Sequence, residues 1–476
     1  MLRFYFNQTS ARGKLTRREW LRIGGLAGLG SAGLLPSAPA ARAAMAGPSG
    51  FGRARSVILI FASGGQSQFE TWDPKPESPL EVRGDFQPIS SAVPGVAICE
   101  HLPRVACLTD RLTIVRSMSH DDRDHGSAAY LALTGRFHLQ KSGNPLPAAD
   151  DLPTYGAVLK RVRRNKRFPH DAVHLNGPAL VPELIGPGQD GGLLGRNFDP
   201  LVLGDVTSGP IAVAGLDPQA GLSKDRLRER LSLKQAMEGS AAALEGNQQA
   251  LDMNELYRQV YDMLASPTCR EAFNLGAEPE QLRDRYGRNR SGQACLLARR
   301  LAEAGVPLIT VIWNHSNRGQ DKAPNLTDEY GWDTHNDIFH AMKTHLLPRF
   351  DESFAALIED LDDRGMLDET LVVCMGEFGR APRVALEPGF AGLTPGRKHW
   401  PTVYSIVLAG AGVQRGAVVG ASDRMGAYPV TQRYGPWDVA ATMFASLGID
   451  PAGHYLDSVQ QPRPITIGQP IQALYG

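Results

Sequence analysis

Short, continuous runs of apolar residues recur along the chain, and longer stretches with helical spacing lie between them. Such runs are typical of strands that are buried on both faces of a parallel sheet. The runs that predict strands are residues 57–62, 112–115, 308–312, 371–375 and 403–409. Helical spacing is clearest over residues 338–361, where Pro348 predicts a kink. This alternation predicts an α/β fold with an open, mostly parallel sheet and helices on both faces.

Residues 222–305 follow a different pattern. They are charged, contain few strand-like runs and have helical spacing. We therefore expect a helical insertion or cap within one α/β domain that spans residues 44–476, rather than a second catalytic domain. Segments 138–153 and 314–330 are polar and rich in glycine, proline or asparagine, which predicts loops near the site.

The first 43 residues predict a twin-arginine signal peptide instead of a part of the fold. Arg17 and Arg18 precede a mild apolar stretch, residues 23–35, and a segment with small residues that offers cleavage sites. The other interpretations are a short membrane anchor or a buried helix, but the apolar stretch is well short of the roughly 20 residues of a membrane span. No later segment approaches that length. We expect export by the twin-arginine (Tat) machinery, to the periplasm or as a secreted protein.

Composition narrows the function only slightly. The 476 residues include 50 Lys+Arg and 50 Asp+Glu, so there is no basic field for nucleic acid and no nucleic-acid partner is expected. Hydrophobic residues make up 42% and charged residues 21%, which is ordinary for a globular protein. The five cysteines lack CxxC spacing and indicate neither a zinc knuckle nor a disulfide framework. Cys99 and Cys107 either pair with each other or pack as free thiols.

Polar and charged residues stand directly after the predicted strands. Ligands of an open α/β sheet bind beyond the carboxyl ends of its strands, and Asp, His and Glu are ligands of divalent metals. The candidates are Ser63, His120, His125, Asp333, His335, Glu377 and Arg380, with Arg397 and His399 just before the last apolar run. Several of these candidates have a structural alternative: Asp333 and His335 as a hydrogen-bonding pair, Glu377 in an ion pair with Arg380 or Arg383, His125 as a helix-start residue, and His399 stacked on Trp400.

Several motifs together resemble one family. They are Gly64-Gly65 with 71–76 (TWDPKP), 116–120 (RSMSH), 331–335 (GWDTH), 376–380 (GEFGR) and 396–400 (GRKHW). Together they resemble the twin-arginine-exported proteins of the domain of unknown function 1501 family, within the alkaline phosphatase and sulfatase superfamily. The resemblance covers essentially the whole chain after residue 43 and implies an alkaline phosphatase-like fold.

The resemblance also implies how a metal is held. Asp333, His335 and His399 match the ligands of one metal ion in phosphatase-like relatives. The second ion of those relatives needs an Asp where this chain has Ser63, and an Asp-His pair where it has Glu377-Phe378. His125 occupies the position of the sulfatase nucleophile, so a mechanism through a modified Cys or a Ser does not transfer. Further departures from the closer family are Gln68, Glu70 and Lys398.

These considerations predict a metal-dependent hydrolase of phosphate or sulfate esters that uses metal-bound water, with a small molecule or a glycan ester as substrate. The metal is expected to be zinc, with calcium or manganese as alternatives. Asp333, His335 and His399 are the expected ligands, Glu377 a ligand or base, His120 a replacement ligand, and His125 a replacement ligand or general acid–base. Arg380 or Arg397 is expected to clamp the anion. The alternative function is a catalytically degenerate member that binds metal or an anionic glycan in cell-envelope assembly.

Overall fold

The computed structural model of the chain describes residues 49–165, 167–181, 183–207, 211, 226, 229, 267–316 and 327–476. The predicted signal peptide, residues 1–43, therefore lies outside the described residues. So does most of the predicted insertion between residues 222 and 266.

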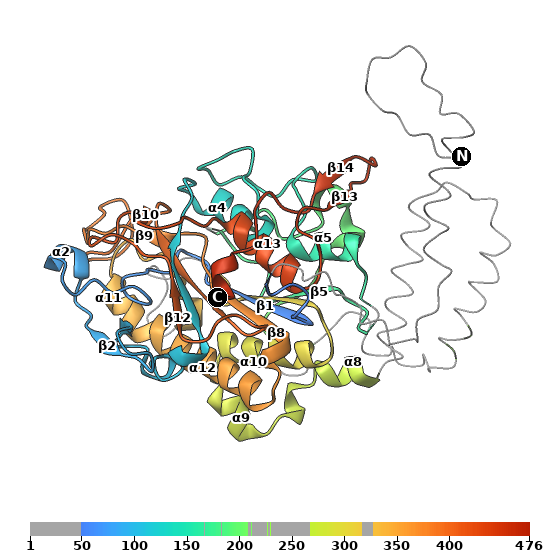
Figure 1. The fold of residues 1–476 in the computed structure, drawn as a ribbon, viewed down its shortest axis with the longest axis horizontal. Coiled ribbons are helices and arrows are strands. Elements are labelled where there is room, and N and C mark those ends of the chain that lie inside the picture. The colour runs from blue at the N-terminus through green and yellow to red at the C-terminus, as the bar shows by residue number, and fades with distance from the viewer. Residues whose placement is uncertain are drawn as a thin grey trace, which may run out of the picture. The chain divides into compact units, whose positions relative to one another are not determined.

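The described residues build an eight-stranded sheet (Figure 1). Its order is β12-β4-β11-β8-β1-β7-β5-β6, and all pairings are parallel except those of β11 with β4 and β8. The strands are β1 (Ser56–Phe61), β4 (Thr113–Met118), β5 (Ala172–Leu175), β6 (Leu201–Leu203), β7 (Leu308–Ile312), β8 (Thr370–Met375), β11 (Tyr404–Ala409) and β12 (Ala417–Val419). Three two-stranded ribbons accompany the sheet: β2 (Pro88–Ser90) with β3 (Ala97–Cys99), β9 (Gly379–Arg380) with β10 (His399–Trp400), and β13 (His454–Leu456) with β14 (Pro462–Pro464).

Helices cover both faces of the sheet, as expected, and Figure 1 shows the two groups above and below the strands. One face packs against α10 and α12, and the other packs against α4, α5 and α13. The α-helices are α2 (Leu80–Arg83), α3 (Pro103–Ala106), α4 (His125–Thr134), α5 (Tyr155–Val162), α8 (Pro267–Ala272), α9 (Glu280–Arg285), α10 (Arg290–Glu303), α11 (Ile338–Ala341), α12 (Leu347–Asp363) and α13 (Pro436–Ser446). The predicted fold class, an open and mostly parallel α/β sheet, is confirmed.

The continuous apolar runs form the central strands because both of their faces are buried. Every residue of β1, β7, β8 and β11 is buried. Alternate side chains of each strand enter the two cores, so that Ile58 and Ile60 lie in one and Leu59 and Phe61 in the other. Burying a side chain of this size contributes about 1.5–3 kcal/mol each.

Two predictions of helical structure are refined. The helical stretch at 338–361 is interrupted by a π-helical turn, η7 (Met342–Leu346), and Pro348 lies in the first turn of α12, where its missing N–H costs nothing. Within the predicted insertion, α10 packs against β7, β1 and α12 and so belongs to the helical layer of the sheet. Whether the remainder forms a cap falls outside the described residues.

All five cysteines lie among the described residues, and all are free thiols; only Cys107 is exposed. The alternative of a Cys99–Cys107 disulfide is therefore not found. Within the described part of the chain, no helix is both long enough and apolar enough to cross a membrane.

Candidate metal centre

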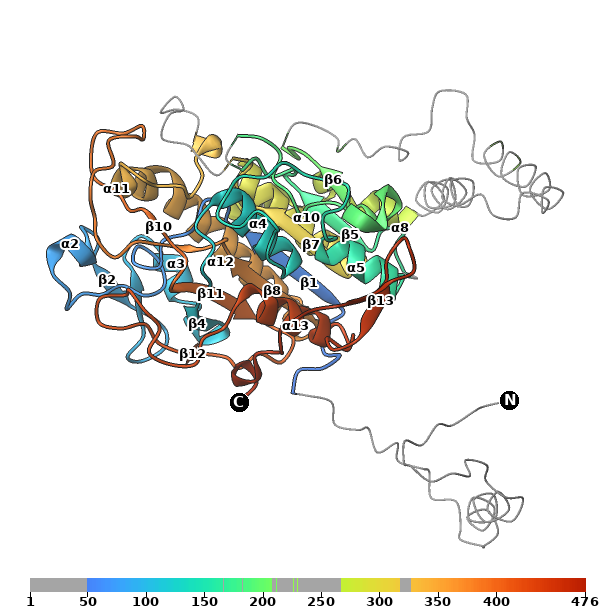
Figure 2. The same cartoon turned by 90° about the horizontal axis from the view of Figure 1, so that it is seen from above.

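Three segments far apart in sequence meet at one edge of the sheet. His125 begins α4, which follows the carboxyl end of β4, and Asp333 and His335 lie in the segment between β7 and α11. His399 opens β10, just before β11. Because β11 runs against the other strands, its first residues lie at the edge where β4, β7 and β8 end. The ribbon of β9 and β10 and the helix α11 lie at this same end in both views (Figure 2).

The four side chains converge on a single point. Asp333 Oδ1 lies 3.0 Å from His125 Nε2, 3.1 Å from His335 Nε2 and 3.4 Å from His399 Nε2. His335 Nε2 and His399 Nε2 are 2.8 Å apart. One ligand atom from each residue lies within 4.8 Å of the others. Adjacent ligand atoms of a tetrahedral zinc with bonds of about 2.0 Å are about 3.3 Å apart, so an ion fits after small shifts.

The other ring nitrogen of each histidine is held by a protein oxygen. His125 Nδ1 lies 2.5 Å from Glu377 Oε1, and His335 Nδ1 lies 2.7 Å from Glu387 Oε2. His399 Nδ1 donates to the carbonyl oxygen of Arg123 at 2.8 Å. Metal-binding histidines characteristically donate their second N–H to a carboxylate or a carbonyl, which fixes the ring and directs the remaining nitrogen at the ion. All three rings satisfy this condition with Nε2 toward the centre.

The protonation states of the cluster without an ion reflect these short distances. Burial would lower the pKa of His125, but the carboxylates of Asp333 and Glu377 outweigh it and raise that pKa to about 9. Burial, together with the charge of His125, lowers the pKa of His399 to about 3. Burial would raise the pKa of Asp333, yet the charges of His125 and Arg380 hold it well below its usual range. Without an ion, His125 is therefore an imidazolium between two carboxylates.

Glu377 and His120 do not join the four converging residues. Glu377 is fully buried, accepts the backbone N–H of Gly64 at 2.8 Å, and contacts the outer nitrogen of His125. Its place is behind a ligand rather than on the ion. The ring of His120 is used on both sides: Nε2 donates to the carbonyl of Glu377 at 2.6 Å, and Nδ1 accepts from the N–H of Asp122 at 3.1 Å. The structure thus gives His120 a supporting role.

The two arginines predicted as anion clamps are buried and directed at protein oxygens. Arg380 is 0% exposed and donates to the carbonyls of Gly65 and Trp332 and to Asp333 Oδ1 at 2.7 Å. Arg397 is 1% exposed and forms a forked pair with Glu70, with nitrogen–oxygen distances of 2.8 and 3.0 Å. Both guanidinium groups are thus engaged by protein oxygens, and their role as an anion clamp stays a prediction.

The three residues that depart from the family pattern also form hydrogen bonds or ion pairs within the protein. Gln68 exchanges two hydrogen bonds with the backbone of Arg380, both at 2.9 Å. Glu70 neutralises Arg397, and the exposed Lys398 lies 3.3 Å from Glu387. These residues brace the segments that carry the site.

Two residues that contact a candidate ligand were not predicted from the sequence. Glu387 and Phe390 lie in the loop between β9 and β10; Glu387 holds His335, and the ring of Phe390 stacks on it at 3.7 Å with an interplanar angle of 8°. The loop is rich in glycine and proline and has no strand or helix pattern, so its path over His335 has no signal in the sequence. His125 was predicted as an acid–base group or replacement ligand, and the structure places it among the converging ligand atoms.

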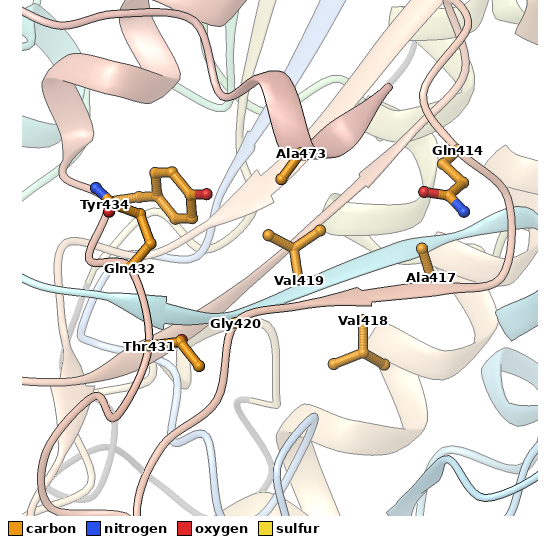
Figure 3. A pocket seen from close by; sticks show the side chains of 9 residues that line it. All are labelled: Gln414, Ala417, Val418, Val419, Gly420, Thr431, Gln432, Tyr434 and Ala473. Atoms are coloured by element: carbon orange, nitrogen blue, oxygen red, sulfur yellow. The ribbon is translucent and has the colours of Figure 1, made fainter. Parts of the chain in front are cut away.

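A separate hollow lies along β12, the edge strand of the sheet (Figure 3). Its volume is about 520 Å³, and its polar lining comprises Gln414, Thr431, Gln432 and Tyr434. The nine residues that line it include no acidic residue, histidine or cysteine. This hollow therefore offers no histidine, cysteine or carboxylate as a metal ligand, whereas the cluster around Asp333 does.

The fold and the cluster together define an open α/β-sheet protein with a His/Asp centre, suited to a metal ion, at the carboxyl edge of the sheet. The chain matches the family model described as "Protein of unknown function (DUF1501)" over residues 54–475 and belongs to that family. No curated protein matches it in sequence.

Solved structures that resemble the chain are distant. They include the PsFucS1 sulfatase from Pseudoalteromonas sp. (15% identity, 84% of this chain and 68% of that chain, TM-score 0.37). A protein in the alkaline phosphatase superfamily from Vibrio parahaemolyticus gives 10% identity, 84% and 68% coverage and a TM-score of 0.39. The phosphonate monoester hydrolase of Agrobacterium radiobacter gives 11% identity, 88% and 77% coverage and a TM-score of 0.38. At these scores the likeness carries nothing about activity.

Proposed function

We propose that this protein is a metal-dependent hydrolase of phosphate or sulfate esters. The observation that carries the proposal is the convergence of three Nε2 atoms and Asp333 Oδ1, with every Nδ1 already held from outside. Three imidazoles and one carboxylate favour zinc over calcium, which prefers an all-oxygen shell. A divalent ion at this point would polarise an ester oxygen and lower the pKa of a water molecule.

The residues around the cluster support a single ion. His125, Asp333, His335 and His399 would hold it, and among the described residues the carboxylates that a second ion would need are replaced or engaged. Ser63 stands at the first of those positions, and the carboxylate of Glu377 is used by Gly64 and His125. Arg380 is a positioning residue, because it holds the same Asp333 oxygen that faces the histidines.

Recognition of an anionic ester would come from the surface. Lys398 is exposed beside His399 in sequence, and the exposed Arg123 contacts the His399 ring through its carbonyl oxygen. The side chain of His399 is 16% exposed, the largest exposure among the four ligands, so the cluster reaches solvent there. Arg123 and Lys398, the second of which also pairs with Glu387, are cations that would attract an anionic substrate toward His399.

The test begins with elemental analysis of the purified protein. About one ion per chain is expected, and His399→Ala should lose most of it, whereas His454→Ala, which changes an exposed histidine of β13, should retain it. A panel of phosphate, phosphonate and sulfate monoesters then tests the reaction, with chelator removing the activity and zinc restoring it. Unchanged ion content in His399→Ala, or a fully loaded protein that hydrolyses no ester, would contradict the proposal.

One observation favours the alternative of a degenerate, non-catalytic member. Four protein ligands are typical of closed structural zinc sites, whereas catalytic sites keep one position for water or substrate. Substitution of the ion by cobalt distinguishes a closed structural site from an open catalytic site. A visible absorption spectrum that shifts on addition of orthophosphate or sulfate indicates an open position, and an unchanged spectrum indicates a closed one.

Export by the twin-arginine route, to the periplasm or beyond, belongs to the same proposal and rests on residues 1–43. Replacing both Arg17 and Arg18 by Lys should leave unprocessed precursor in the cytoplasm. Normal export of the double variant would refute this route.

A further inference from the structure

Exposed apolar side chains gather on one loop beside the cluster. Between β9 and β10, residues 386–394, here called the rim loop, include Leu386, Phe390 and Leu393, whose exposures are 50%, 39% and 91%. Single exposed leucines are common on protein surfaces, but here three large apolar side chains within eight residues of one loop are exposed. The ring of Phe390 lies flat on His335, so this loop adjoins a ligand of the proposed ion.

The backbone of the rim loop is held firmly by hydrogen bonds to the segment that carries His335. Asn336, which is buried, donates to the carbonyls of Glu387 and Phe390 at 2.9 and 3.1 Å and accepts the N–H of Glu387 at 2.8 Å. Asp337 accepts the N–H groups of Leu393 and Thr394 at 3.0 and 2.6 Å. These two residues directly follow His335 in sequence. The loop and the ligand are therefore fixed to each other.

The backbone also packs closely at this junction. Gly392 has a φ of +112°, and a Cβ there would lie 2.6 Å from Cβ of Asn336. Only glycine fits such an approach. A loop that served merely to shield His335 would gain from turning its leucines inward. This one keeps Leu386 and Leu393 in solvent while its backbone is tied down.

We propose that the rim loop binds an apolar group of the substrate, so that the preferred ester carries an alkyl or aryl chain on its alcohol side. The inference rests on the proposed hydrolase function. The anionic head would lie at the cluster, and the chain would extend from it across Phe390 toward Leu386 and Leu393. Apolar area covered there adds affinity in proportion to chain length.

The test compares esters that differ only in chain length. Ethyl and hexyl phosphate, and ethyl and hexyl sulfate, have alcohol leaving groups of nearly equal acidity. Each methylene fully removed from water is worth about fourfold, so four partly covered methylenes should favour hexyl by about tenfold to a hundredfold in kcat/KM. The assays use the full-length protein loaded with zinc.

The variants keep the ion in place. Leu386→Ala/Leu393→Ala leaves Phe390 on His335, so ion content and turnover of the ethyl esters should stay within about twofold, while the preference for hexyl falls about fivefold or more. Leu456→Ala is the matched control, because Leu456 is 42% exposed on β13, which lies at the other end of the molecule (Figure 2). Equal kcat/KM for ethyl and hexyl esters, or an unchanged hexyl preference in the double variant, would overturn the inference and leave the hydrolase proposal standing.

A binding measurement distinguishes failure of the rim-loop inference from failure of the hydrolase proposal. If no ester is hydrolysed, calorimetry with ethylphosphonate and hexylphosphonate on the zinc-loaded protein still tests the rim loop. Tighter hexyl binding that the double variant loses supports the inference, and equal binding overturns it. A third result would also overturn the inference: phosphatidylcholine vesicles retain the native protein but not the double variant, and hexylphosphonate binds no more tightly than ethylphosphonate. The loop would then be a lipid-surface contact.

Discussion

Ion binding at the candidate centre should release a proton, and the structure identifies His125 as the residue that loses it. The pKa of His125 is raised to about 9 in the absence of an ion, so at pH 7.5 its ring is almost entirely protonated. Its Nδ1 faces Glu377 and its Nε2 faces Asp333, and Nε2 is the atom that an ion would take. The proton on Nε2 must therefore leave when the ion binds.

The magnitude follows from that pKa. The neutral fraction of His125 increases about 75-fold between pH 6.5 and 8.5, so the apparent zinc affinity should increase by about the same factor. Asp333 is already ionised and His399 already neutral across this range, because their pKa values lie far below it. Calorimetry in two buffers of different ionisation enthalpy should show about one proton released per ion at pH 7.5.

Two carboxylate variants sharpen this test. Glu377→Gln should lower the pKa of His125, because Glu377 is one of the groups that raise it, and the release at pH 7.5 should decrease. Glu387→Gln is the matched control: it removes a carboxylate from the outer nitrogen of His335 and should leave the proton release from His125 in place. Zinc affinity that is independent of pH between 6.5 and 8.5 would refute the assignment of His125 as a ligand that is protonated before the ion binds.

Three further predictions follow from packing and charge. The protein without its ion should lose stability on both sides of neutrality. Because the pKa of His125 is raised in the folded protein, its protonation stabilises the fold fully below pH 6.5. This stabilisation is lost as the pH rises through about 9, which lowers the free energy of unfolding by about 3 kcal/mol. The lowered pKa of His399 costs stability as pH falls from 6.5 toward 3, and thermal melts across pH measure both. Phe350→Ala should cost about 3–5 kcal/mol in urea unfolding, because its ring is fully buried among Trp72, Trp313 and Trp332; melting within 1 °C of native would contradict this. One thiol, Cys107, should react with a thiol reagent in the native protein and all five after unfolding, and rapid labelling of more than one native thiol would count against the packing of the other four.

The central strands were predictable because burial on both faces leaves an unbroken apolar run. The strands β5, β6 and β12 were not, and the reasons differ. The strand β5 contains His174, a buried polar residue that breaks the apolar run. The strands β6 and β12 have only three residues each, which is too short for a period to be recognised.

The ligand residues were predictable as candidates but not in their roles. Strand-end positions identified Asp333, His335, His399 and His125, because the topology of an open sheet brings strand ends together. The charge of Arg380 and Arg397 near those positions suggested an anion clamp. Sequence carries the charge but not the direction of the side chain, and in the structure both guanidinium groups donate to protein oxygens.

The antiparallel strand β11 explains why the site includes a residue from so late in the chain. In a purely parallel sheet, the start of this strand would lie at the amino edge, away from His125 and Asp333. Because β11 is reversed, His399 enters at the carboxyl edge, and β10 pairs with β9 there so that His399 lies opposite Arg380. The same pairing places Arg380 against Asp333. One reversal of direction thus supplies a ligand and also the group that orients another, and a bound ion would add to the hydrogen bonds and ion pairs that already join these segments.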